Sequence, residues 1–229
     1  MRWRPVWKRL LYLRFLLTQR HRYGHLALER VAGRPFLVLP HVFNPALFAS
    51  GRLLAQQIQQ RTDLLAPGAR VLDLGTGSGI GAIFAARKAR SVLATDLNPH
   101  AVRCARINVL LNGLEDRIEV RQADLFDGLG ERFDVVLFNP PYYRGTPSTP
   151  LDQAWRSPDV LERFACQLPR VLNPGGYALV VLSSDGEQPA FLDAFRANRL
   201  TSQIVARRDL LNETLTVYRV SRCVEESTS

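Results

Sequence analysis

The sequence is poor in cysteine, and its cysteines form no closely spaced pair. Cys104, Cys166 and Cys223 are the three cysteines of the 229-residue chain, and they lie far apart. An odd, scattered set argues against a disulfide framework of the secreted type and against a zinc site built from paired cysteines. His21 and His25 have no third ligand nearby, so we expect no metal site. A reducing cytoplasm is the location that this pattern favours.

The chain also lacks an uninterrupted apolar run long enough to cross a membrane, which takes about 18 residues or more. Its most apolar stretch near the start, "LLYL" followed by "FLL", is broken by Arg14 and flanked by further arginines. No small-residue cleavage site follows this stretch. We therefore expect neither export nor a membrane span.

Most of the chain carries almost no net charge. The formal net charge is +9, and residues 1–34 hold nine arginines and lysines against one acid, so they account for +8 of it. This asymmetry predicts a basic N-terminal helical arm over residues 1–34, a single domain over 35–222 and a polar tail over 223–229. The arm is compatible with a helix packed on the domain, with a contact to nucleic acid, or with a helix on a membrane surface.

Apolar strand-like stretches alternate with helical ones through the domain, which indicates an α/β fold with a mostly parallel sheet and helices on both faces. The end of the chain differs. The stretches "SQIVAR" and "TLTVYRV" are strand-like and are separated only by "RDLLNE". This gap is too short for a parallel crossover, so we predict that the last strand is antiparallel.

The segment "DLGTGSG", from Asp73 to Gly79, follows an apolar strand and precedes a helix. Glycines at this place allow a tight turn and let a ligand approach the backbone, so a nucleotide-type cofactor is expected at the carboxyl ends of the strands. Residues 77–82 also fit the G-x-G-x-x-A fingerprint of dinucleotide enzymes, with Asp96 about 20 residues further on, which leaves a nicotinamide cofactor open.

Three acids favour S-adenosylmethionine instead. Asp73 lies at the end of the first strand, where it can meet the cationic amino-acid end of that cofactor. Asp96 ends the second strand and suits two ribose hydroxyls. Asp124, in "RQADLF", ends the third and can accept from the adenine amino group. Each acid alone is compatible with an ordinary helix cap, but their succession at strand ends indicates a binding site.

The next strand, "FDVVLF", ends in "NPPYY" at residues 139–143. Asn-Pro-Pro is compatible with a plain strand terminator, and "PPYY" with a WW-domain ligand. A chemical reading is that the Asn139 side-chain oxygen and the Pro140 carbonyl accept from the two hydrogens of a planar NH2 group, which stabilises the positive charge that develops on its nitrogen during methyl transfer. The prolines fix φ, and Tyr142 is expected to stack on the planar group.

Residues 68–145 resemble the core of class I S-adenosylmethionine-dependent methyltransferases of the NPPY type. The resemblance implies a seven-stranded Rossmann-like sheet with a reversed last strand, in which "DLGTGSG" and "NPPY" meet. It implies this cofactor-binding set: Asp73, Gly75, Thr76, Gly77, Ser78, Gly79, Asp96, Leu97, Asp124, Leu125 and Asn139. It implies a substrate-binding set of Asn139, Pro140, Pro141 and Tyr142, of which Asn139, Pro140 and Tyr142 are the expected catalytic residues.

Over residues 35–222 the chain is similar to glutamine methyltransferases of peptide-chain release factors, in the compact branch without a long helical N-terminal domain. The similarity rests on "VLPHVFNPALFASGRLLAQQI", on "NPPY" followed by a "TP" loop, on "AW" and on "ETLTVYRV". It implies a protein glutamine as the acceptor. Three alternatives remain. The acceptor is an adenine or guanine amine in RNA or DNA, reached through the basic arm; the acceptor is a small molecule; or the chain is an inactive cofactor-binding module. The sequence predicts no oligomeric state.

Overall fold

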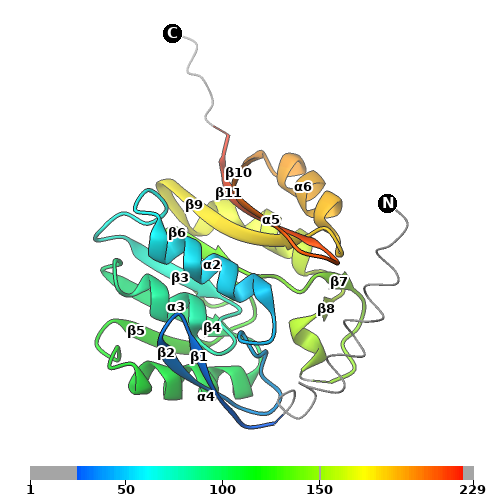
Figure 1. Ribbon diagram of the computed structural model, residues 1–229. Coiled ribbons are helices and arrows are strands. Elements are labelled where there is room, and N and C mark those ends of the chain that lie inside the picture. The colour runs from blue at the N-terminus through cyan, green and yellow to red at the C-terminus, as the bar shows by residue number, and fades with distance from the viewer. Residues whose placement is uncertain (1–24, 150, 224–229) are drawn as a thin grey trace.

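The computed structural model describes residues 25–149 and 151–223, and its centre is a seven-stranded sheet with the strand order β10-β11-β9-β6-β3-β4-β5 (Figure 1). The strands of this sheet are β3 (Arg70–Leu74), β4 (Ser91–Asp96), β5 (Ile118–Gln122), β6 (Phe133–Phe138), β9 (Leu172–Ser183), β10 (Leu200–Asp209) and β11 (Thr214–Arg222). The helices are α2 (Ala49–Gln60), α3 (Ile80–Ala85), α4 (Pro99–Leu111), α5 (Val160–Val171) and α6 (Gln188–Ala197). The predicted α/β fold is confirmed.

The last strand runs against its neighbours, as predicted. β11 pairs antiparallel with both β9 and β10, whereas β9, β6, β3, β4 and β5 pair in parallel. β3 lies between β4 and β6, and Leu74 at its end is level with Thr95 on one side and Phe138 on the other. The three segments that follow these strands therefore meet at one edge of the sheet.

Helices cover both faces of the sheet. Residues of α2, α3 and α4 share one hydrophobic cluster with Val71 of β3, and residues of α5 and α6 share a second cluster with Leu72 and Leu74. Side chains alternate between the two faces along a strand, so β3 needs apolar residues on both. This explains why its sequence reads as a nearly continuous apolar run.

The expected helical arm over residues 1–34 is wrong in its last part. Residues 1–24 lie outside the described residues, but Ala27–Val31 forms strand β1, which pairs antiparallel with β2 (Arg34–Val38). The turn between them has positive φ at Ala32 and Gly33, as two-residue hairpins require. The hairpin is tied to α4, since Asn108 accepts from Leu37 N at 2.7 Å and donates to Leu37 O at 2.8 Å.

Two very short strands lie between β6 and α5 in the chain, near the carboxyl ends of the central strands. β7 (Tyr143–Arg144) pairs in parallel with β8 (Arg156–Ser157), and the 3-10 helix η2 (Asp152–Ala154) lies between them. This pairing folds the segment after "NPPY" back over the strand ends. Within residues 25–149 and 151–223, none of the helices is long and apolar enough to cross a membrane.

Candidate active site

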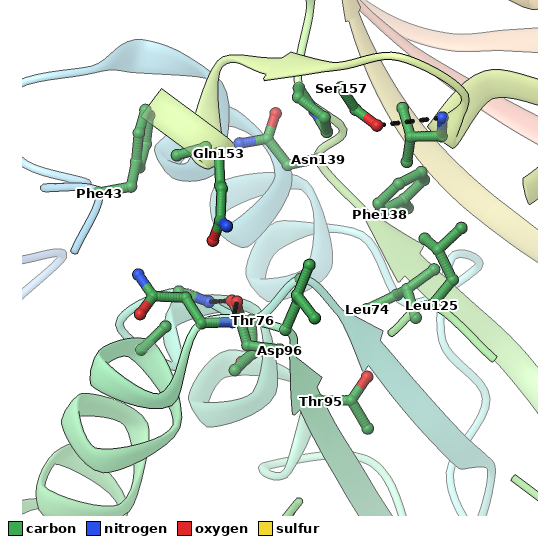
Figure 2. Close-up of a pocket in the computed structure, with 18 of the residues that line it drawn as sticks. Phe43, Leu74, Thr76, Thr95, Asp96, Leu125, Phe138, Asn139, Gln153 and Ser157 are labelled. Atoms are coloured by element: carbon green, nitrogen blue, oxygen red, sulfur yellow. Dashed lines mark hydrogen bonds between the residues drawn. The ribbon is translucent and has the colours of Figure 1, made fainter. Parts of the chain in front are cut away.

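A cavity of about 360 Å³ opens at the carboxyl ends of β3, β4 and β6. The glycine loop forms its floor, Asp96 and Asp124 lie on its wall, and Asn139 faces it from the end of β6 (Figure 2). Of the expected cofactor-binding residues, only Gly79 lies off the cavity wall. Gly79 instead precedes α3 with φ of +85°, and a Cβ there would lie 3.4 Å from Ala105.

The glycine loop turns sharply between β3 and α3. Gly75 and Gly77 have φ of +64° and +57°, in the left-handed region that side chains disfavour. Thr76 N donates to Thr95 O at 2.8 Å, which ties the loop to the end of β4. The loop therefore presents backbone rather than side chains to the cavity at these two positions.

Asp73 is buried at the base of this loop, with 5% of its surface exposed. Its Oδ2 accepts from Thr76 Oγ1 at 2.5 Å and from Ala82 N at 2.8 Å. Burial raises the pKa of the Asp73 carboxyl to about 6, although both hydrogen bonds oppose the rise. Asp73 thus organises the loop, and its expected contact with a cationic ligand stays a prediction.

Asp96 joins the loop to the second strand end. Its Oδ2 accepts from Gly77 N and its Oδ1 from Asn98 N, both at 2.9 Å. Burial raises the pKa of Asp96, while the hydrogen bonds from these amides oppose it. Each oxygen of the carboxylate keeps a further lone pair, so the side chain can still accept from two hydroxyls.

Asp124 has a partner that the sequence did not suggest. Arg163 of α5 donates to Asp124 Oδ2 at 3.0 Å and also reaches Asp127 at 3.0 Å. Arg163 lies on the cavity wall, as does Leu125, which has a positive φ of +50°. The predicted contact of Asp124 with an adenine amino group would therefore use the oxygen that Arg163 leaves free.

The "NPPY" residues divide between the cavity and the interior. Asn139 and Pro141 line the cavity, whereas Pro140 and Tyr142 are buried and do not. Tyr142 borders a separate small hollow with Leu161. Its hydroxyl donates to Asn139 Oδ1 at 2.7 Å. The stacking role expected for Tyr142 is thus unsupported in this arrangement, because its ring does not face the cavity.

Aromatic residues do line the cavity, and they include Phe43 and Phe138. The Phe43 ring lies 4.7 Å from Phe48 and 5.2 Å from Trp155, measured between ring centroids. Figure 2 shows the Phe43 side chain on the same side of the cavity as Gln153, whose side chain extends from η2 towards Asp96. Sequence reasoning missed Phe43, Gln153 and Arg163, since each comes from a segment distant in sequence.

Two residues on the cavity wall carry buried hydroxyls. Ser78 Oγ and Thr95 Oγ1 have no hydrogen-bond partner within the part of the chain that the structure describes, and both residues line the cavity. Unpaired buried polar groups are costly, so such atoms indicate a ligand or water that completes them. With the three acids Asp73, Asp96 and Asp124, a tight glycine loop and apolar side chains such as Leu97 and Leu125, the wall fits the charged, ribose and adenine parts of S-adenosylmethionine.

No group of three or more potential metal ligands lies within residues 25–149 and 151–223.

The sheet order, the reversed last strand and the cavity at the strand ends together define a class I, S-adenosylmethionine-dependent methyltransferase. The chain belongs to the methyltransferase small domain family, whose family model matches residues 34–206. It is therefore an enzyme that uses S-adenosylmethionine as its methyl donor.

Relatives of the chain differ in the acceptors that their names give. A provisionally named protein N5-glutamine methyltransferase of Methanocaldococcus jannaschii is 30% identical over 66% of this chain and 81% of its own length. A release factor glutamine methyltransferase of Cereibacter sphaeroides is 32% identical over 70% and 61%. A tRNA1(Val) (adenine(37)-N6)-methyltransferase of Phocaeicola vulgatus is 33% identical over 55% and 56%. The chain spans less than two thirds of the last two relatives.

Solved structures share the fold. The ribosomal protein L11 methylase of Lactobacillus delbrueckii subsp. bulgaricus superimposes with a TM-score of 0.60 over 79% of this chain and 81% of its own, at 24% identity. This likeness supports the seven-stranded methyltransferase architecture of the chain.

Proposed function

We propose that the chain methylates the nitrogen of a planar NH2 group, and that this group is the side-chain amide of a glutamine in a protein such as a peptide-chain release factor. The observation that carries the proposal is the position of Asn139, which faces the cavity at the end of β6 beside the glycine loop. The two glutamine methyltransferases among the relatives support the choice of acceptor.

The chemistry follows from the position of the Asn139 amide. The cofactor supplies an electrophilic methyl group on a sulfonium. An amide nitrogen is a poor nucleophile because its lone pair is delocalised, so the site must stabilise the charge that develops on it. The Asn139 oxygen keeps one lone pair beyond the bond from Tyr142 and can accept one N–H of the acceptor. We assign the second N–H to the Pro140 carbonyl, which would have to turn towards the cavity, because Pro140 does not line it in this arrangement.

Phe43 and Pro141 are apolar residues on the cavity wall. We propose that they hold the planar acceptor group in place, a role first expected of Tyr142. Asn139, Pro140 and Pro141 remain the proposed substrate-binding residues. A reducing, cytoplasmic location agrees with the three free cysteines.

A base amine in RNA is the second candidate, favoured by the +8 charge of residues 1–34 and by the tRNA adenine methyltransferase among the relatives. To separate the two, the purified chain is incubated with radiolabelled S-adenosylmethionine and cell extract, and protein is then separated from nucleic acid. We expect the label in protein. Label in RNA that is lost when residues 1–24 are deleted would contradict the proposal and favour the second candidate.

Asn139→Ala is the matched inactive variant. It should abolish labelling but leave S-adenosylmethionine binding largely intact, since Asn139 acts on the acceptor. Asn198→Ala is the control, because Asn198 ends α6 and its side chain donates to Ala194 O at 2.9 Å, away from the cavity wall. Undiminished labelling by Asn139→Ala would show that the Asn139 side-chain oxygen plays no part in methyl transfer.

A further inference from the structure

The Asn139 amide is held by side chains from two other segments. Asn139 Nδ2 donates to Ser50 Oγ at 3.2 Å, and Tyr142 OH donates to Asn139 Oδ1 at 2.7 Å. Ser50 lies in the first turn of α2, 89 positions away in sequence, and only 4% of its surface is exposed. The two contacts fix both ends of the amide.

The Ser50 hydroxyl also acts on Tyr142, since it opposes the rise that burial causes in the pKa of Tyr142. The three side chains therefore form a ring of neighbours. Two hydrogen bonds run through it, from Tyr142 to Asn139 and from Asn139 to Ser50. Hydrogen-bonded networks of this kind polarise and rigidify their members.

Ser50 and Tyr142 hold the Asn139 amide between them. Turning the amide by 180° would require both hydroxyls to reverse the direction of their hydrogen bonds, so that Ser50 donates and Tyr142 accepts. The observed orientation leaves the second lone pair of Oδ1 and the second hydrogen of Nδ2 for the cavity. Asn139 lines that cavity, whereas Ser50 and Tyr142 do not.

We propose that Ser50 and the Tyr142 hydroxyl are positioning residues that orient Asn139 Oδ1 towards the methyl acceptor. The inference rests on the proposed function, because it assumes that Asn139 accepts from the acceptor NH2 group. It assigns to Tyr142 a role through its hydroxyl rather than through its ring. Ser50 then links α2, in the N-terminal part of the domain, to the chemistry at the end of β6.

Support for the Tyr142 backbone comes from the loop after β9. Glu187 N donates to Tyr142 O at 3.0 Å. A Cβ on Gly186 would lie 2.6 Å from that same oxygen, so the two segments are in close contact. The Tyr142 side chain therefore has little freedom to leave the ring without a shift of its backbone.

The test compares Ser50→Ala, Tyr142→Phe, the double variant and Ser50→Thr, with Ser91→Ala as the control at the opposite, exposed end of β4. Initial rates are measured at saturating radiolabelled S-adenosylmethionine with one fixed amount of heat-inactivated cell extract as acceptor. Misplacing a reacting group costs about 10- to 100-fold, so we expect each single variant to lose about that much. Affinity for S-adenosylmethionine should stay within about twofold, and Ser50→Thr should restore most of the rate.

Because the three groups form one unit, the double variant should lose no more than about threefold beyond the worse single variant. Losses that multiply would contradict a shared ring. A normal rate in Ser50→Ala would contradict the positioning role outright.

A second readout does not depend on the acceptor. In nitrogen-15 spectra, the Asn139 side-chain NH2 pair is identified by its absence in Asn139→Asp, and its exchange with water is followed. We expect slow exchange in the wild type and faster exchange in Ser50→Ala. Equal exchange in both would overturn the ring, whereas an intact ring in a wild type that labels nothing would count against the proposed function alone.

Discussion

Replacing Gly81 by alanine tests whether the packing under the glycine loop creates the cofactor site. Gly81 lies in α3 opposite the Asp73 carboxylate, and an added Cβ would lie 2.3 Å from Oδ1 and 2.8 Å from Cγ of Asp73. Asp73 cannot withdraw freely, since Thr76 Oγ1 at 2.5 Å and Ala82 N at 2.8 Å both donate to it. The substitution must therefore displace the loop or break these bonds.

The expected cost follows from these contacts. Overpacking a well-packed interior costs about 1–3 kcal/mol. A lost hydrogen bond to a charged group costs about 1.5–3 kcal/mol. We expect these effects to lower the free energy of unfolding of Gly81→Ala by about 2–4 kcal/mol. The higher helix propensity of alanine offsets ~1 kcal/mol of that loss. A displaced loop should also weaken S-adenosylmethionine binding by at least about tenfold.

Gly51→Ala is the matched control for stability, and its cofactor affinity is compared with that of the wild type because Gly51 also lines the cavity. Gly51 is also helical, so the same gain in helix propensity applies, but its added Cβ would meet nothing nearer than Ile80 Cγ2 at 3.7 Å. Urea unfolding and calorimetric titration with S-adenosylmethionine compare the two variants. If Gly81→Ala unfolded at the same urea concentration as Gly51→Ala and bound the cofactor equally well, the reasoning about Asp73 would be refuted.

Three further predictions concern the cavity wall. Asp96→Ala should raise the dissociation constant for S-adenosylmethionine about 100-fold, because two charge-assisted hydrogen bonds to the ribose are lost. Asp193→Ala, on the exposed face of α6, is the control and should leave the dissociation constant unchanged. Calorimetric titration measures both. The pKa of Asp73 is about 6, so its carboxyl binds a proton in the folded protein between about pH 4 and 6 that the unfolded chain has lost. The free energy of unfolding should therefore fall as the pH rises through this window. Over the same rise, up to pH 6, the affinity for a cationic ligand should increase by up to about tenfold per pH unit. Asp73→Asn should flatten both pH dependences, and thermal unfolding with and without cofactor measures them. Phe43→Leu should slow labelling about fivefold, the value of one aromatic contact, with little change in cofactor affinity.

Local patterns predicted the parts of the site that lie within one strand–loop–helix unit. The glycine loop, Asp96 and the reversed last strand follow from residues that are close in sequence, and their positions are confirmed by the sheet order and pairings. Such features depend on local backbone preferences and strand periodicity, which a single sequence displays.

Contacts between distant segments could not be predicted in the same way. The bond from Asn139 to Ser50 spans 89 positions, and that from Arg163 to Asp124 spans 39. The pairing of β1 with β2 also replaces the last part of the expected basic helical arm by a hairpin, because arginines on an exposed strand edge leave the same compositional signal as on a helix. Tertiary packing decides each of these, and single-sequence patterns carry no record of it.

The nature of the methylated atom tests the central claim most directly. The labelled acceptor is purified, hydrolysed in strong acid, and its volatile and non-volatile products are separated. An N-methylated glutamine amide releases its label as methylamine, and this is the result we predict. Label recovered as methanol would place the methyl group on oxygen, and label retained on a nucleobase would place it on RNA or DNA; either result would contradict the assignment of a protein amide as the acceptor.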